Sequence, residues 1–416
     1  MFWQAYRYLA HGWVRRYWIE PKFYFTYYGF SWVHPWPGNG MYIHWAILGL
    51  LALFIAVGFC YRFSAILFFL GFTYSFLLDE TNYLNHFYLI CLLSFLLIFL
   101  PANRAMAIDA WLKPGSRAHT TPVWTLWLMR AQIGVVYFFA GVAKLSPDWL
   151  GGETIRAFIQ SYRISLPLIR QEWTPYLLTY GGLLVDLLLA PALLWRRTRL
   201  AAFCVATTFH LLNAHFFSIG VFPWLSIAAT SLFLSPSWPR KFVGLIFPIA
   251  TSPVPSAEPL PNERKQLVIF SLVSLYIAVQ VLIPLRHFLY PGPTDWTYQG
   301  HRFSWRMLLL DRTPSSEFLV TDPNAGTTVR IDPIKFLTPR QLDKMGARPD
   351  MVLQFAHHLA AILPRAGPKP LQVRARVLLS LNDRKPQLLI DPNVDLAAEK
   401  RSLWPARWIL LNDVRP

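Results

Sequence analysis

Long apolar runs separated by short polar segments occupy most of the chain before His287. A transmembrane helix needs about 20 residues to cross the ~30 Å hydrocarbon core of a bilayer. By this measure the pattern predicts eight spans, near 42–60, 63–79, 85–100, 123–145, 174–195, 200–216, 219–235 and 267–286. We therefore predict an all-α polytopic membrane domain over residues 41–286.

The N-terminal segment, residues 1–40, departs from this pattern. It is rich in aromatic residues, but charged side chains such as Arg7, Arg15 and Glu20 interrupt it. Aromatic residues mixed with basic ones are typical of helices that lie in the membrane interface rather than cross it. We predict an interfacial amphipathic segment here.

From His287 onward the pattern changes to shorter, mixed segments. Runs that favour β-strands occur at 318–321, 328–331, 373–380 and 388–390. The turn-rich sequence Asp322–Gly326 separates the first two runs, which predicts a β-hairpin. Residues 340–364 have helical periodicity instead. Residues 287–416 are therefore predicted to form a small α+β domain, large enough to bury a core of its own.

Composition and charge agree with a membrane protein and indicate its orientation. Only 15% of the residues are charged and 54% are hydrophobic, whereas soluble domains carry roughly 25% charged residues. The net charge of +17 comes without any nucleic-acid recognition motif, so we predict no nucleic-acid partner. Basic residues gather in the loops of one side, namely Arg62, Arg104, Lys113, Arg117, Arg196, Arg197, Arg199, Arg240, Lys241, Arg264 and Lys265. The positive-inside rule makes that side cytoplasmic and places the C-terminal domain in the periplasm or lumen.

Two ionisable residues fall deep inside predicted spans. Arg130 and Asp186 lie at depths that differ by only ~3 Å when each is counted from the cytoplasmic end of its helix. A charge in a span needs a partner or a function. We predict a structural ion pair between Arg130 and Asp186.

Other polar residues approach the outer rim of the membrane domain. Arg130, Tyr137 and Lys144 recur every seven residues and so share one helical face. Lys144 at the outer end is either an interfacial lysine that reaches to the headgroups or, in an apolar pocket, a neutral amine that acts as a general base. Asn85 and His86 start one helix at the same depth, and His210 and Asn213 approach the end of another. We predict no metal site, because no His–carboxylate spacing suits one.

Several long motifs resemble one known family. They are Phe76–Leu89, Arg130–Trp149, Phe209–Asn213, Phe217–Gly220, Ser235–Lys241, Phe303–Met307, Ser380–Arg384 and Ile390–Asp395. Together they resemble the vitamin K-dependent γ-glutamyl carboxylases and their bacterial relatives, the horizontally transferred transmembrane domain (HTTM) proteins. The resemblance runs from about residue 40 to near the end of the chain.

The resemblance implies an integral membrane enzyme that uses reduced vitamin K (phylloquinol or menaquinol), O2 and CO2. In this family the quinol is oxygenated to its epoxide while CO2 is added to the γ-carbon of a glutamate in a peptide or protein. The resemblance implies that Lys144 is the general base, supported by Asn85 and His86. Further candidates for quinone or substrate binding are Tyr137, His210, Asn213, His287, His301 and Trp305.

Three other functions are compatible with the sequence. The chain could form quinol epoxide, or act as a monooxygenase, without carboxylating a protein. It could also be a non-enzymatic quinone- or lipid-binding membrane protein, although keeping Lys144, Asn85 and His86 together argues against this. A transporter would need broken helices that meet at mid-membrane, whereas the polar residues gather here at one rim.

Overall fold

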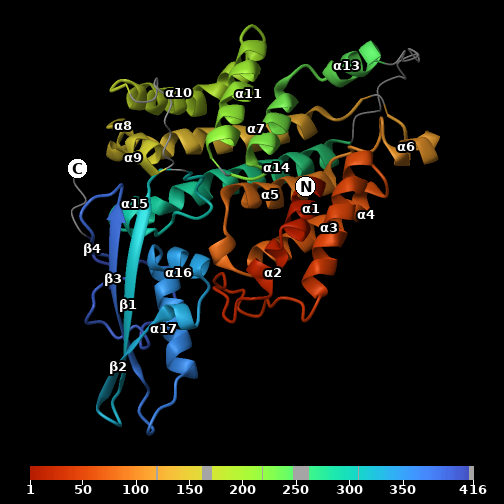
Figure 1. Ribbon diagram of the computed structural model, residues 1–416. Helices are drawn as coiled ribbons and strands as arrows, with labels where there is room; N and C mark the ends of the chain where they lie inside the picture. Colours follow the sequence, from red (N-terminus) through yellow and green to blue (C-terminus); the bar gives the residue numbers. More distant parts are fainter. Residues whose placement is uncertain (119, 162–170, 218, 247–261, 308, 412–416) are drawn as a thin grey trace.

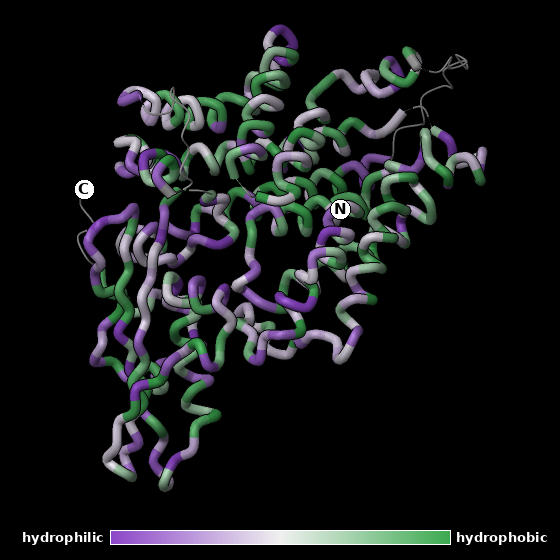
Figure 2. The backbone as a smooth tube through the Cα atoms, viewed as in Figure 1, coloured by the Kyte–Doolittle hydropathy of each residue, from purple (hydrophilic) through white to green (hydrophobic). Residues whose placement is uncertain are grey.

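The computed structural model describes residues 1–118, 120–161, 171–217, 219–246, 262–307 and 309–411. A helical region forms the N-terminal part, and a smaller domain with a β-sheet lies at its lower left in Figure 1. Figure 2 shows apolar residues along the helices of the first region and a more mixed distribution in the second.

A helix forms at each of the eight predicted apolar runs. These are α3 (Gly40–Val57), α4 (Tyr61–Leu77), α5 (Asn85–Phe99), α7 (Val123–Ala143), α10 (Thr174–Leu194), α11 (Arg199–Phe216), α12 (Phe222–Thr230), which η4 (Ser231–Phe233) continues, and α14 (Glu263–Leu285). Short helices connect them, including α6 (Ile108–Leu112), α8 (Pro147–Leu150), α9 (Glu153–Ser161), α13 (Trp238–Ile246) and α15 (Thr294–Thr297).

The predicted number of spans is not confirmed. Four helical segments in the described part of the chain are long and apolar enough to cross a membrane, namely 40–57, 123–143, 174–194 and 263–289. The helices at 61–77, 85–99 and 222–233 are apolar but shorter. The structure thus supports a membrane protein with four candidate spans.

The N-terminal segment contains two short helices, α1 (Phe2–Ala10) and α2 (Trp13–Trp18). Both are much shorter than the ~20 residues that a span requires. Helix α1 buries Gln4, Ala5 and Tyr8, while the aromatic residues Phe2 and Trp3 remain exposed. Tyr8 stacks on Trp45 of α3 with ring centroids 4.4 Å apart, so this segment is packed along the helical region.

The C-terminal domain is an antiparallel sheet covered by two helices. The strand order is β2 (Thr327–Ile331), β1 (Arg312–Asp322), β3 (Gln372–Leu381), β4 (Gln387–Leu388). Val320 pairs with Val329 in the β1–β2 register, which confirms the predicted hairpin. The predicted helical stretch forms α16 (Pro339–Gly346) and α17 (Pro349–Ile362), and the buried face of α17 contributes Val352 and Phe355 to the domain core.

The N-terminal segment also completes the C-terminal domain. Phe25 is fully buried in the core of that domain. The backbone N–H of Thr26 donates to Oε1 of Gln354 (2.9 Å), and Nε2 of Gln341 donates to the carbonyl of Phe23 (2.7 Å). Segments more than 300 residues apart in sequence are therefore held together by hydrogen bonds between side-chain amides and the backbone.

A charge cluster, in which Glu80 and Arg302 are buried and Asp350 is partly exposed, joins the two regions. Glu80 begins the short 3-10 helix η1 (Glu80–Asn82) between α4 and α5. Arg302 lies 2.8 Å from Asp350 and 3.4 Å from Glu80. Burial raises the pKa of Glu80 from its ordinary value of 4.5 to about 8, although Arg302 opposes this effect. The pKa of Asp350 is lowered because Arg302 and a hydrogen bond from Glu80 outweigh its burial. One arginine thus serves two carboxyl groups, and the closer one keeps the negative charge.

This cluster predicts a pH dependence of folding. Because the pKa of Glu80 is raised in the folded state, the stability it contributes is present below pH ~4.5 and is lost as the pH rises through about 8. Burial also raises the pKa of Asp79, to about 6, so pH 6–8 isolates Glu80 best. We expect Glu80→Gln to unfold with a weaker decrease in Tm between pH 6 and pH 8 than the parent. The exposed change Glu399→Gln should keep the parental slope; equal slopes for all three proteins would contradict this assignment.

Candidate active site

A close contact between α7 and α10 positions the site. A Cβ atom built on Gly141 would lie 2.6 Å from Cδ2 of Leu187 and 3.1 Å from its backbone nitrogen. Only glycine allows the two backbones to approach this closely. As a result, the C-terminal end of α7 lies against α10 at Leu187.

Lys144 follows directly after α7 and is buried against α10. Its Nζ lies 2.6 Å from Oδ2 of Asp186, and both side chains are more than 90% buried. Nζ also donates to the carbonyl of Ala140 (3.4 Å) and lies 5.0 Å from the ring centroid of Trp149. The Trp149 ring is itself held by a hydrogen bond from Nε1 to the carbonyl of Thr179 (3.0 Å).

The predicted pairing of Arg130 with Asp186 is wrong. Asp186 pairs with Lys144, while Arg130 donates to the backbone carbonyls of Leu232 (2.9 Å) and Leu234 (3.1 Å). The prediction counted depth from helix ends and so assumed that the start of α7 and the end of α10 lie at the same level. The Gly141–Leu187 contact shows that they do not.

Arg130 instead satisfies carbonyl groups at the end of η4, where a helix leaves its last acceptors without partners. We expect Arg130→Met to destabilise the folded protein by about 1.5–3 kcal/mol, the range for hydrogen bonds to a charged group. Arg130→Lys should recover only part of this loss, because an ammonium cannot reproduce the planar fork of donors. Thermal unfolding in detergent measures both; parental stability of Arg130→Met would contradict this role.

A second polar pair lies next to the first. The hydroxyl of Tyr137 on α7 and Nε2 of His210 on α11 are 2.6 Å apart, and both residues are buried. Nδ1 of His210 is buried without a hydrogen-bond partner in the described structure. Helices α7, α10 and α11 therefore bring together two polar pairs, Lys144–Asp186 and Tyr137–His210.

These residues line one cavity of about 320 Å³. Its other polar lining residues include Asn213 and Ser226, and most of the wall is apolar, for example Ile133, Phe209 and Phe222. Trp173, Leu177, Leu178 and Leu212 also line it, and each of them is exposed on the outer surface of the helical region. The cavity is therefore bordered by exposed apolar residues of the helical region.

The predicted pair Asn85 and His86 lies outside the lining of this cavity. Nδ2 of Asn85 donates to the carbonyl of Arg306 (2.9 Å), and its Oδ1 accepts from the hydroxyl of Tyr83 (2.9 Å). The ring centroid of His86 lies 5.8 Å from that of Phe222, and Phe222 in turn contacts His210 at 5.8 Å. His86 is thus separated from the cavity by one aromatic ring.

Three further candidates lie at the junction with the C-terminal domain. Trp305 is fully buried and stacks on Tyr88, with ring centroids 5.0 Å apart. His301 stacks on Tyr298 at 4.2 Å, and its pKa is held well below its ordinary value by burial and by nearby arginines. His287 donates from Nδ1 to the carbonyl of Pro284 (2.7 Å) and lines a separate, smaller cavity. None of these three residues lines the cavity that contains Lys144.

Sequence reasoning missed two members of the site. Trp149 was part of a recognised motif but was given no function, and it forms the aromatic wall beside Lys144. Asp186 was assigned a structural role with Arg130, and it is the partner of Lys144. The glycine at 141, placed one turn before Lys144, is the sequence signal that indicates a close helix contact at this level.

Comparison with known families agrees with this architecture. Residues 1–238 match the model of the HTTM domain, and residues 265–414 match that of the lumenal domain of vitamin K-dependent gamma-carboxylase. No solved structure matches the chain. The two matches together describe a membrane protein that combines an HTTM domain with a gamma-carboxylase lumenal domain. The chain belongs to the vitamin K-dependent gamma-carboxylase family and carries its HTTM domain.

Proposed function

We propose that the protein is a membrane enzyme that oxygenates reduced vitamin K or menaquinol with O2 and couples this step to the addition of CO2 to the γ-carbon of a glutamate. The observation that carries the proposal is the buried Lys144–Asp186 pair at the polar end of a cavity that faces the bilayer.

The residues of the cavity fit a lipid-soluble quinol. Its isoprenoid or phytyl tail would lie along the apolar wall, where Leu177, Leu178 and Leu212 border the bilayer. Lys144 of the Lys144–Asp186 pair would hold one hydroxyl group of the quinol, and His210 of the Tyr137–His210 pair would hold the other. When bound, the quinol supplies the electrons that reduce O2.

The Lys144–Asp186 pair can accept a proton without losing its internal contact. Of its possible protonation states, the one that carries a single shared proton is neutral overall and so favoured in an apolar cavity. Moving that proton from Nζ to the carboxylate of Asp186 leaves a free amine on Lys144. The amine then takes a proton from a quinol hydroxyl, and the apolar wall and the Trp149 ring keep water away from the ammonium that results.

The Tyr137–His210 pair orients a second hydroxyl group. If Tyr137 donates its proton to Nε2 of His210, the imidazole carries its own proton on Nδ1. That N–H has no partner in the described structure. It is therefore available to donate to a bound oxygen atom.

Two products distinguish the full reaction from its alternatives. Purified protein in nanodiscs is incubated with the reduced quinone, O2 and 14C-labelled CO2, with and without a glutamate-containing peptide. We expect quinone epoxide and, with peptide, labelled γ-carboxyglutamate. Epoxide without labelled peptide would indicate quinol oxygenation alone. The absence of both products would reject the enzymatic proposal in favour of a quinone- or lipid-binding protein.

The orientation of the chain is a further proposal. The basic loops that carry Arg197 and Arg240 should face the cytoplasm, and Thr328 in the hairpin should face the periplasm or lumen. Single cysteines at these three positions, in a background where the exposed Cys60 and Cys204 are replaced by serine, can be labelled in intact cells. We expect a membrane-impermeant maleimide to label only Thr328→Cys; labelling of the other two before permeabilisation would contradict this topology.

A further inference from the structure

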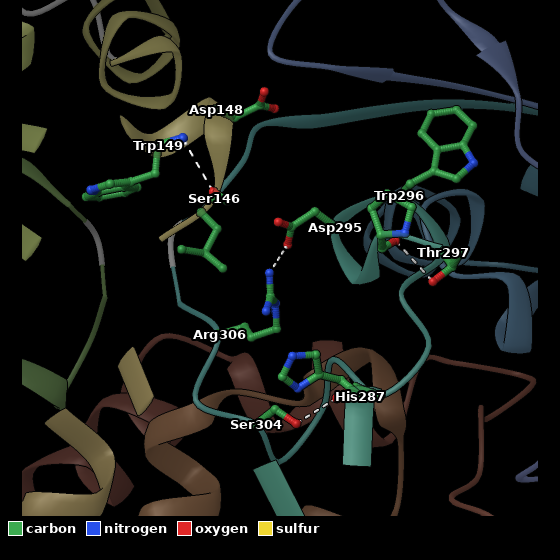
Figure 3. A network of polar contacts seen from close by, with 12 residues as sticks. Ser146, Asp148, Trp149, His287, Asp295, Trp296, Thr297, Ser304 and Arg306 are labelled. Atoms are coloured by element: carbon green, nitrogen blue, oxygen red, sulfur yellow. Dashed lines mark hydrogen bonds and ion pairs between the residues drawn. The ribbon is translucent and has the colours of Figure 1, made fainter. Parts of the chain in front are cut away.

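A second cavity, of about 270 Å³, lies on the other side of the end of α7. Ala143, Leu145 and Ser146, the neighbours of Lys144, form one wall. His287, Phe288, Ser304 and Arg306, from the end of α14 and the loop that follows α15, form the opposite wall. Figure 3 shows this region, with the guanidinium of Arg306 directed toward Asp295.

Arg306 is only partly satisfied in this cavity. Its NH2 lies 2.7 Å from Oδ1 of Asp295, but its Nε is buried and has no hydrogen-bond partner in the described structure. The residue is only 9% exposed. A buried guanidinium N–H that lacks an acceptor is costly, so it favours a ligand that supplies one.

The other polar groups suit the same kind of ligand. Oγ of Ser146 accepts a hydrogen bond from the backbone N–H of Trp149 (3.4 Å), so the hydroxyl can donate its own proton. His287 is the exception, because its Nδ1 donates to a carbonyl (2.7 Å) and Nε2 of the neutral imidazole, an acceptor, offers the anion no donor. Arg286 adds positive charge, since its NH1 lies 3.5 Å from Oγ of Ser304 at the wall of the cavity.

The backbone that carries Arg306 is shaped for this position. Phe303 and Trp305, the residues that flank Ser304, have φ values of 62° and 56°. Residues other than glycine adopt this left-handed backbone conformation at an energetic cost, and residues in this conformation concentrate at ligand sites. The carbonyl of Arg306 is held in addition by Asn85.

We propose that this cavity binds a planar carboxylate-type oxyanion, with Arg306 as its principal ligand. The two arginines and the single Asp295 carboxylate give the surroundings a net positive charge, which is the balance that attracts a monoanion. One oxygen atom of the anion accepts from Nε of Arg306, and Ser146 can donate to another. Ser146 follows Lys144 by two residues in the sequence, so the anion is held beside the segment that carries Lys144. An organic carboxylate and bicarbonate share this chemistry.

Thermal unfolding of the full-length protein in nanodiscs tests this site without using quinol chemistry. A ligand that binds the native state raises Tm in proportion to its occupancy. Sodium acetate, sodium glutamate and sodium bicarbonate are each compared with sodium chloride at equal ionic strength, and acetamide is the neutral isostere. Because no quinol is present, failure of the epoxide assay would not affect the result.

We expect the carboxylate-type anions to raise Tm above the chloride value, and acetamide to have no effect. Arg306→Lys keeps a positive charge for Asp295 but loses the planar donor, so it should need about tenfold more anion for the same shift. Asp295→Asn removes the carboxylate that pairs with Arg306, so this variant should need a lower anion concentration than the parent for the same Tm shift. The exposed change Arg330→Lys is the matched control and should behave as the parent. A response to bicarbonate alone, or to acetate and glutamate alone, identifies the source of the anion and supports the site.

Two results would overturn the proposal. One is that the three anions give the same Tm as chloride in both the parent protein and Asp295→Asn. The other is a carboxylate-dependent shift that is the same in Arg306→Lys as in the parent.

Discussion

Replacement of Lys144 by alanine is expected to lower the rate of quinone epoxide formation by about 10²–10⁴-fold, the usual contribution of a general base. The reason is that Lys144 supplies the amine at the polar end of the cavity, buried beside Asp186 at 2.6 Å. The measurement is chromatographic quantification of epoxide formed from the reduced quinone by the purified variant.

Two controls separate chemistry from folding in this experiment. The exposed change Lys385→Ala, between β3 and β4, should leave epoxide formation unchanged. A small primary amine added to Lys144→Ala should restore part of the activity, because it can occupy the vacated space and accept the proton. If Lys144→Ala is folded and forms epoxide at the parental rate, Lys144 is not the base.

Replacement of Asp186 by asparagine is expected to destabilise the folded protein by about 3–5 kcal/mol, the cost of breaking a buried ion pair from one side. The ammonium of Lys144 would then be buried in an apolar cavity without its counter-charge. The measurement is thermal or denaturant unfolding, together with the yield of folded protein.

The double change Lys144→Met and Asp186→Leu isolates the cause of that loss. Removing both charges leaves neither of them unpaired, so it should recover much of the stability while abolishing epoxide formation. The exposed change Glu399→Gln is the matched control for loss of one carboxylate. Parental stability of Asp186→Asn would show that the pair contributes little.

The apolar pattern was sufficient to predict where the helices lie, because a run of apolar residues can only be satisfied by burial or by lipid. The hairpin was predictable for a local reason as well, since Asp322–Gly326 determines the turn between β1 and β2. The number of spans was not predictable in this way. Helices such as Phe222–Phe233 are apolar but too short to show by length alone whether they cross a membrane.

Contacts between helices depend on register, which the pattern of one helix does not contain. Arg130 and Asp186 matched in depth when counted from helix ends, yet Gly141 lies opposite Leu187 and brings Lys144 to Asp186 instead. The contribution of Phe25 to the C-terminal core was unpredictable for a similar reason. It depends on a contact between distant segments that no local signal marks.

Part of the site followed from a shared face and part from the motifs. Tyr137 and Lys144 were placed on one side of a helix by their spacing, and both line the cavity with His210 and Asn213. Asn85 and His86 share the same level but face other neighbours. Their catalytic role remains a prediction, since position along a helix does not specify which side chain reaches a cavity.

The most direct test of the account is the rate of epoxide formation by Lys144→Arg across pH 6–10, measured beside the parent protein. Arginine keeps the positive charge that Asp186 requires, so the variant should fold and keep its cavity. A guanidinium stays protonated over this whole range and cannot accept the quinol proton. We expect epoxide from the parent and none above background from Lys144→Arg at any pH. Epoxide formation by the arginine variant at a near-parental rate would contradict the assignment of Lys144 as the base.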